Sequence, residues 1–195
     1  MPSPVRLNRN RTAPPDTSSG AAAQVYDRLR ADILSLQMEP GAVINRLNLQ
    51  RRFGLSSTPV RDALMRLGEE GLVDIVAQSA TTVSLIDIDK AREAQFLRRA
   101  LEQEAVETVC ASADRTVAQD LKSSIQRQTE AAMREDLARF DEFDREFHRC
   151  LFDAAGVLGL FHLVRRQSGH IDRIRRLHLP HAGKMQEVEI GRAHV

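Results

Sequence analysis

The chain has 195 residues, and 42% of them are apolar, which is enough to bury a hydrophobic core in one or two domains. Tryptophan is absent, aromatic residues make up only 4%, and Leu, Ala, Arg and Glu dominate, so we expect a mainly α fold. No apolar stretch approaches the length of a membrane span, and two cysteines, Cys110 and Cys150, cannot build a disulfide framework. These features argue against a transmembrane protein and a disulfide-stapled secreted domain, and we expect a cytoplasmic protein with free thiols.

The first part of the chain is basic, although the net charge of the whole chain is only +1. Residues 1–66 contain ten arginines and five acidic residues, which gives this part a net charge of +5. We expect residues 1–20 to form a disordered basic tail, with a transit peptide as the alternative. A basic front suits a surface that faces nucleic-acid phosphates, but solvated arginines are common, so charge alone does not decide.

Residues 25–54 have the pattern of two consecutive helices. Apolar residues recur at helical spacing over residues 25–36, and the sequence MEPG at 38–41 ends this first helix. Asn45 can cap a second helix, and Gly54 can end it because glycine accepts a left-handed backbone.

A third helix follows after a turn of only a few residues. Ser56 or Ser57 can cap it, and Pro59 fits the first turn, where no amide donor is needed. Its buried stripe consists of Val60, Ala63, Leu64 and Leu67. Residues 72–86 have β-branched residues on both sides of a polar centre, which predicts a small two-stranded hairpin. Three helices and a hairpin in this order make a winged helix-turn-helix over residues 21–86.

The polar face of the third helix gives it a candidate function. Ser57, Thr58 and Arg61 project away from the buried stripe at the helix N-terminus, where backbone amide donors also point outward. A recognition helix places such residues at base edges in the major groove, where hydroxyls and arginine contact phosphates and guanine. A capped helix with a solvated arginine explains this helix equally well when it is taken alone. The neighbouring elements favour double-stranded DNA as the partner.

Residues 38–75, MEPGAVINRLNLQRRFGLSSTPVRDALMRLGEEGLVDI, resemble the DNA-binding domain of GntR-family transcriptional regulators, most clearly in FGLSSTPVRDAL and EEGLV. The resemblance covers roughly residues 22–86 and implies a homodimer that binds a pseudo-palindromic operator. The candidate DNA-binding residues are Ser56, Ser57, Thr58, Arg61 and Arg51. The sequence departs from the family pattern at two places. Ser57 stands where the family usually has an arginine, and residues 78–81 lack the usual glycine of the wing tip. These departures leave the operator sequence and the wing contacts open, but they do not affect the expected fold.

Helical periodicity continues from residue 87, so we expect residues 87–195 to form an all-α helical-bundle effector domain. The inward face of one helix reads Leu137, Phe140, Asp144, His148, Leu151 and Ala155. Asp144 and His148 therefore lie on adjacent turns in the middle of an apolar face. A buried carboxylate must be paired or coordinated. Either a metal ion such as zinc or nickel or an internal Asp–His hydrogen bond would satisfy it.

The sequences RRALEQEAVE at 98–107 and DREFHRCLFDAAG at 144–156 resemble the FCD domain that accompanies one large GntR branch. The resemblance implies that Asp144 and His148 join two later histidines to bind a divalent metal, which helps to hold a small carboxylate effector. Arg98 matches an arginine of the family pattern and is a candidate partner for the effector anion. A surface or interface arginine is an equal alternative.

The later histidines do not follow in the expected sequence context, because the chain ends in EIGRAHV. We therefore expect the domain at 87–195 to be incomplete, with residues 190–195 not native and the metal site incomplete. No role is assigned to His162, His170 or His194. His178 and His181, on either side of Pro180, could replace the later ligands, but we expect them to be solvated histidines.

The sequence thus predicts a ligand-responsive transcriptional regulator that is not an enzyme. One alternative is a metal-dependent helical-bundle enzyme built around Asp144 and His148, although no general base, nucleophile or phosphate loop accompanies them. Another alternative is a plain helical interaction module.

Overall fold

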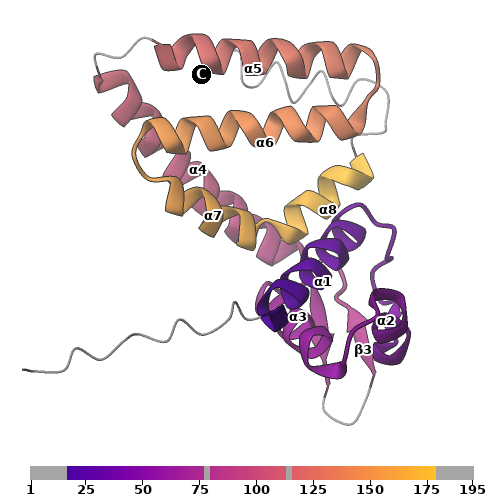
Figure 1. The fold of residues 1–195 in the computed structure, drawn as a ribbon. Helices are drawn as coiled ribbons and strands as arrows, with labels where there is room; N and C mark the ends of the chain where they lie inside the picture. The colour runs from indigo at the N-terminus through magenta and orange to yellow at the C-terminus, as the bar shows by residue number, and fades with distance from the viewer. Residues whose placement is uncertain (1–16, 77–79, 113–115, 179–195) are drawn as a thin grey trace, which may run out of the picture.

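The computed structural model describes residues 17–76, 80–112 and 116–178, and it is mainly helical, as predicted (Figure 1). In chain order the elements are α1 Thr17–Leu34, β1 Val43–Ile44, α2 Arg46–Phe53, α3 Ser57–Glu69, β2 Val73–Ile75, β3 Thr81–Val83, α4 Ile88–Ala111, α5 Thr116–Met133, α6 Leu137–Ala154, α7 Leu158–Gln167 and α8 Gly169–His178. We refer to α1–β3 as the N-terminal domain and to α4–α8 as the helical domain. Among the described residues, no helix is both long enough and apolar enough to cross a membrane.

The N-terminal domain is organised around α1 and α3, which pack against each other over one continuous apolar core. The predicted stripe of α3 lies in this core with Val25, Leu29 and Ile33 of α1. Helix α1 begins at Thr17, so residues 17–20 are helical and the prediction of a disordered tail over 1–20 was wrong at its end. This start adds two turns ahead of the first predicted apolar position, Val25. Residues 1–16 lie outside the described part of the chain.

Helix α2 begins and ends at the two capping residues that the sequence predicted, Asn45 and Gly54. The Asn45 side chain accepts a hydrogen bond from the Asn48 amide and so caps the first turn. Gly54 ends the helix with a left-handed backbone at φ +66°. Ser56 stands at the N-cap of α3, but its hydroxyl makes no capping hydrogen bond.

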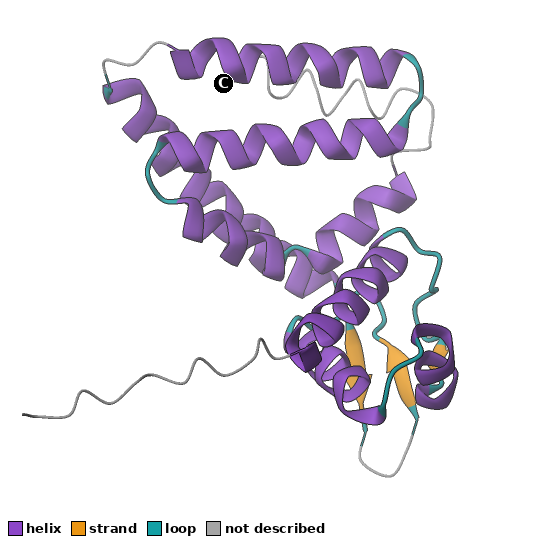
Figure 2. Ribbon diagram, in the orientation of Figure 1, coloured by secondary structure: helices purple, strands orange, loops and turns teal. Residues whose placement is uncertain are grey.

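The wing is a three-stranded antiparallel sheet in the order β1-β3-β2 (Figure 2). The predicted hairpin is present as β2 and β3, with Val73 paired to Val83. Strand β1 was not predicted, because its two residues show no alternation and become a strand only by pairing with β3. Of the predicted wing-tip residues 78–81, residues 78 and 79 lie outside the described part of the chain, and Thr81 begins β3.

The helical domain places α5 and α6 side by side, with α4, α7 and α8 on the other side of α6 (Figure 1). Helix α6 buries the predicted stripe, including Asp144 and His148. The sequence from 158 to 178 forms two helices, α7 and α8, that meet at Ser168 and Gly169. At this junction a Cβ on Gly169 would lie 2.6 Å from Cδ2 of the buried Leu72, so glycine permits a close approach to the N-terminal domain.

Candidate functional site

The N-terminal end of α3 is an exposed polar surface on a buried apolar base. Ser56, Ser57 and Thr58 are exposed there, and the Arg61 side chain is 66% exposed. Pro59 and Val60 are buried on the opposite side of the same turn. All these polar groups therefore project from the domain while the core fixes the position of the helix.

The same surface includes residues of α2 that sequence reasoning did not assign. Arg46 and Gln50 of α2 and Ser57, Thr58 and Arg61 of α3 line a small hollow of about 120 Å³. Arg46 also donates a hydrogen bond to the Thr81 hydroxyl at 2.9 Å, which joins α2 to the wing. The signal that could have found Arg46 is its place in the first turn of α2. We call this surface, together with the exposed Arg51, the α2–α3 face.

The arginines of the N-terminal domain differ in whether an acidic side chain neutralises them. Arg28 and Arg52 both pair with the buried Asp32, at 3.2 and 3.1 Å. Arg30 pairs with Glu70 at 2.8 Å. Arg61 has only a loose 3.6 Å contact with Asp62. Arg51 and Arg61 therefore keep exposed positive charge on the α2–α3 face, and Arg66, which lies over the Tyr26 ring, is exposed elsewhere on the domain.

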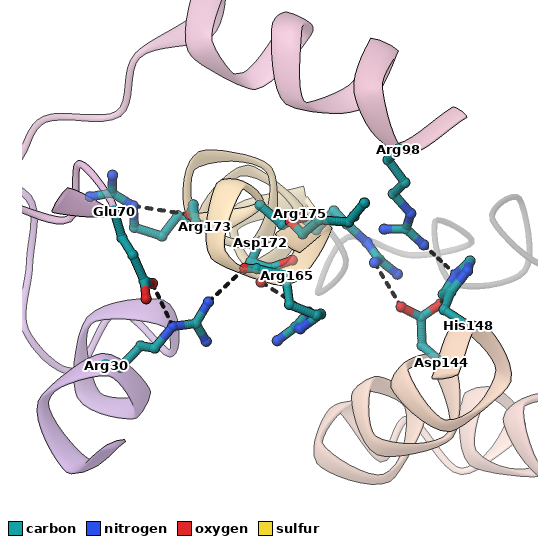
Figure 3. A network of polar contacts seen from close by, with 12 residues as sticks. Arg30, Glu70, Arg98, Asp144, His148, Arg165, Asp172, Arg173 and Arg175 are labelled. Carbon is teal, nitrogen blue, oxygen red and sulfur yellow. Dashed lines mark hydrogen bonds and ion pairs between the residues drawn. The ribbon is translucent and has the colours of Figure 1, made fainter. Parts of the chain in front are cut away.

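The second candidate site is a cluster of charged side chains between α4, α6 and α8 (Figure 3). Arg175 of α8 donates to Oδ2 of Asp144 at 2.9 Å. Nε2 of His148 lies 3.7 Å from Oδ1 of Asp144, and the Arg98 guanidinium contacts the same Nε2. Glu102 of α4 completes the cluster, with Oε1 lying 2.7 Å from Nδ1 of His148. The predicted residues Arg98, Asp144 and His148 are thus brought together.

Sequence reasoning missed Glu102 and Arg175. Glu102 follows Arg98 by one helical turn and accepts from its Nε at 2.8 Å. Burial raises the pKa of the Glu102 carboxyl, but the hydrogen bond from His148 and the charge and hydrogen bond of Arg98 outweigh it, so the net pKa is lowered. Burial lowers the pKa of Arg175, whereas the charge and hydrogen bond of Asp144 raise it, with a net rise. Both groups therefore stay charged within the cluster.

The described residues do not make a metal centre. No group of three or more His, Cys, Asp or Glu within the described ranges has the arrangement of a metal site. The Arg175 guanidinium lies on Asp144, and the Arg98 guanidinium lies on His148, where a cation would have to bind. His181 and His194 lie outside the described residues.

Helix α8 connects this cluster to the N-terminal domain through buried polar contacts. Arg173 is fully buried and donates to the Ser84 carbonyl at 2.7 Å, and burial lowers the pKa of its guanidinium. Within the helical domain, the amide of Asp87, the N-cap of α4, donates to Nδ1 of His170 at 3.0 Å and holds α8 against the start of α4. Arg30 of α1 donates to the Arg165 carbonyl at 2.8 Å. The two domains therefore share a specific polar interface (Figure 3).

A winged helix-turn-helix joined to a helical domain defines a class of DNA-binding transcriptional regulators. Residues 21–83 match the bacterial regulatory proteins of the gntR family, and residues 93–190 match the FCD domain. The chain belongs to the GntR family of bacterial regulatory proteins and carries an FCD domain.

The similar proteins are named as HTH-type transcriptional regulators or repressors. An HTH-type transcriptional regulator in an unstable DNA locus of Streptomyces ambofaciens is 35% identical over 80% of this chain. The alignment spans 65% of that relative, so this chain covers just under two thirds of its length. The HTH-type transcriptional repressor RspR of Escherichia coli is 28% identical over 81% of this chain and 69% of its own.

Solved structures share the fold. The chain of Escherichia coli McbR/YncC matches with a TM-score of 0.68 and 21% identity, covering 87% of this chain and 79% of that one. A GntR regulator from Rhodococcus sp. RHA1 matches with a TM-score of 0.64 and 19% identity, covering 90% and 87%.

Proposed function

We propose that this regulator binds a pseudo-palindromic operator as a homodimer, in the cytoplasm, with the N-terminal end of α3 in the major groove. We assign DNA binding to residues 21–86 and effector binding to residues 87–195. The observation that carries the proposal is the concentration of solvent-facing hydroxyls and arginines on the α2–α3 face, above a buried apolar base.

The residues have separate roles in this proposal. Arg61 reads a base edge, because an exposed arginine at a helix N-terminus can donate two hydrogen bonds to guanine. Ser56, Ser57 and Thr58 contact phosphates, for which short hydroxyl side chains and helix N-terminal amides are suited. Arg51 contacts the phosphate backbone from α2.

The first test compares Arg61→Ala with Arg139→Ala in binding to an operator obtained by selection from random DNA. Arg139 is a matched control, because its side chain is 68% exposed and makes a 3.6 Å contact with Asp136, much as Arg61 does with Asp62. We expect Arg61→Ala to weaken operator binding by about 1–3 kcal/mol and Arg139→Ala to leave it unchanged. Binding should also weaken steeply with salt.

Two results would contradict the proposal. One is equal operator affinity for Arg61→Ala and the unchanged protein. The other is a selected sequence without two-fold symmetry, because a homodimer on an operator requires two related half-sites.

We further propose that the charged cluster of the helical domain receives a small carboxylate effector through Arg98. The Arg98 side chain is 17% exposed and its guanidinium already pairs with Glu102, so an effector carboxylate would compete with Glu102 for it. Asp144 and His148 would supply two ligands to a divalent metal only with further ligands from outside the described residues. The effector assignment is tested by a titration with small dicarboxylates, in which Arg98→Gln should abolish any change in operator affinity.

A further inference from the structure

A second cavity lies at the junction of the two domains, away from the charged cluster. It has a volume of about 390 Å³, at the lower end of the range for small-molecule sites. Its walls are the turn at residues 68–71, the first turns of α4 with Lys90 and Glu93, and the α7–α8 junction with Gln167 and His170. Both domains therefore contribute to this junction cleft.

His170 presents a buried hydrogen-bond donor to the junction cleft. The residue is only 4% exposed, and its Nδ1 faces two donors, the Asp87 amide at 3.0 Å and an Arg173 guanidinium nitrogen at 3.1 Å. Because Nδ1 accepts, the hydrogen of the neutral ring must be on Nε2. Burial, together with the charges of Arg173 and Lys90, lowers the pKa of His170 and keeps the ring neutral. No described residue accepts a hydrogen bond from Nε2.

Lys90 supplies a second donor beside the first. A Cβ on Gly71 would lie 3.5 Å from Nε2 of His170 and 3.9 Å from Nζ of Lys90. The absence of a side chain at Gly71 therefore leaves a space that both donors border. A carboxylate is the natural occupant, because one oxygen can accept from the neutral imidazole while the group faces the ammonium charge.

The remaining charges of the cleft decide what else the ligand must carry. Glu69 and Glu93 line the same cavity, whereas Glu70 is committed to Arg30 and to the Tyr26 hydroxyl. A simple anion would be attracted by one lysine and repelled by two carboxylates. A ligand with both a carboxylate and an ammonium group would satisfy both sides.

We propose that the junction cleft binds a small zwitterionic amino carboxylate, held through its carboxylate by Lys90 and the Nε2–H of His170. The ammonium group of the ligand faces Glu69 and Glu93. Because Gly71 belongs to the N-terminal domain and His170 to the helical domain, the bound ligand bridges them. This site is separate from the cluster around Arg98, and it does not depend on DNA binding.

The test is a calorimetric titration of the full chain with L-alanine, L-lactate and propionate. These probes share a carboxylate and differ in whether the α-carbon carries an ammonium, a hydroxyl or a hydrogen. We expect L-alanine to bind most tightly, L-lactate more weakly and propionate most weakly. Equal affinity for all three, or no binding of L-alanine at millimolar concentration, would overturn the proposal.

Two variants assign the contacts. Lys90→Met removes the ammonium of an exposed residue, and we expect it to weaken L-alanine binding about tenfold. The matched control Lys122→Met changes an exposed lysine of α5 and should have no effect. His170→Asn keeps an oxygen acceptor for the Asp87 amide but removes the Nε2–H donor, so it should also weaken binding. Unchanged affinity in Lys90→Met would reject the site.

A measurement on the unchanged protein covers the case in which His170→Asn does not fold. The imidazole nitrogen resonances of His170 should show the Nε2–H tautomer and shift when L-alanine is added. The Nδ1–H tautomer, or no shift at saturation, would reject the proposal. Since none of these variants changes the α2–α3 face, loss of this site and loss of operator binding are distinguished directly.

Discussion

The two domains of this regulator are stabilised by different kinds of buried side chain. The N-terminal domain buries thirteen residues of its described part in one continuous core, all hydrophobic. In the described part of the helical domain, the apolar clusters are small, with Ala131, Ala132 and Phe140 in one and Phe152, Phe161 and Val164 in another. Buried polar groups separate them. The first domain relies mainly on one apolar core, although it also buries Asp32 and Thr81, whereas buried polar groups are more numerous in the described part of the second.

The largest effect that should follow from this difference is in the core of the N-terminal domain. Leu64 is 1% exposed, and Leu64→Ala should lower the free energy of unfolding by about 3 kcal/mol. Leu101 is only partly buried against the Phe152 cluster, so Leu101→Ala should cost about 1 kcal/mol. Denaturant unfolding can separate the domains, because the single tyrosine, Tyr26, lies in the N-terminal core. Equal costs would contradict the contrast between the domains.

The next effect concerns a polar group inside the apolar core. Burial and the hydrogen bond to Glu70 raise the pKa of Tyr26 from 10.0 to about 12. A raised pKa in the folded state stabilises the fold below pH 10, and this contribution is lost as the pH rises toward 12. We expect a loss of about 2–3 kcal/mol over this window.

Tyr26→Phe is the control for this prediction. The difference in unfolding free energy between the two proteins should be constant below pH 10 and should change by about 2–3 kcal/mol, against the tyrosine protein, as the pH approaches 12. The absorbance of the single tyrosine gives its pKa directly. A Tyr26 that ionises near its ordinary value would contradict the prediction.

A smaller effect is expected at the interface between the domains. A Cβ on Gly169 would overlap the buried Leu72, so Gly169→Ala should destabilise the protein by about 1–2 kcal/mol. Gly159 in α7 is the matched control, because a Cβ there meets nothing within 4 Å. Gly159→Ala should instead stabilise by about 0.5–1 kcal/mol through helix propensity. Both changes are measured by thermal unfolding, and a neutral Gly169→Ala would show that the domains are not closely packed there.

The same contrast explains which features could be predicted from the sequence. Apolar spacing and the capping residues Asn45 and Gly54 determined the helices of the N-terminal domain, because these signals are local. Strand β1 was missed because its pairing partner is distant in sequence. The close approach of Gly169 to Leu72 was also missed, since Leu72 lies almost a hundred residues earlier.

The residues of the candidate sites also divide into those that a local sequence pattern reveals and those that only the packing of distant elements reveals. Asp144 and His148 were found from their places on an apolar helix face. Glu102 and Arg175 were not found, because their role depends on how α4 and α8 pack around α6. His170 received no role from the sequence, and its significance comes from the Asp87 amide and the junction cleft.

The smallest effect we expect is the response of the charged cluster to zinc. Asp144 and His148 each contact an arginine, so a zinc ion would have to displace two guanidinium groups and would gain only two protein ligands from this helix. Calorimetric titration of the chain with zinc chloride should therefore show weak binding or none, with no rise in thermal stability. Arg175→Met would remove one competing cation, so any weak zinc binding at Asp144 should strengthen in that variant. Tight stoichiometric binding to the unchanged chain, lost in Asp144→Asn, would mean that ligands beyond the described residues complete a metal site and displace both arginines.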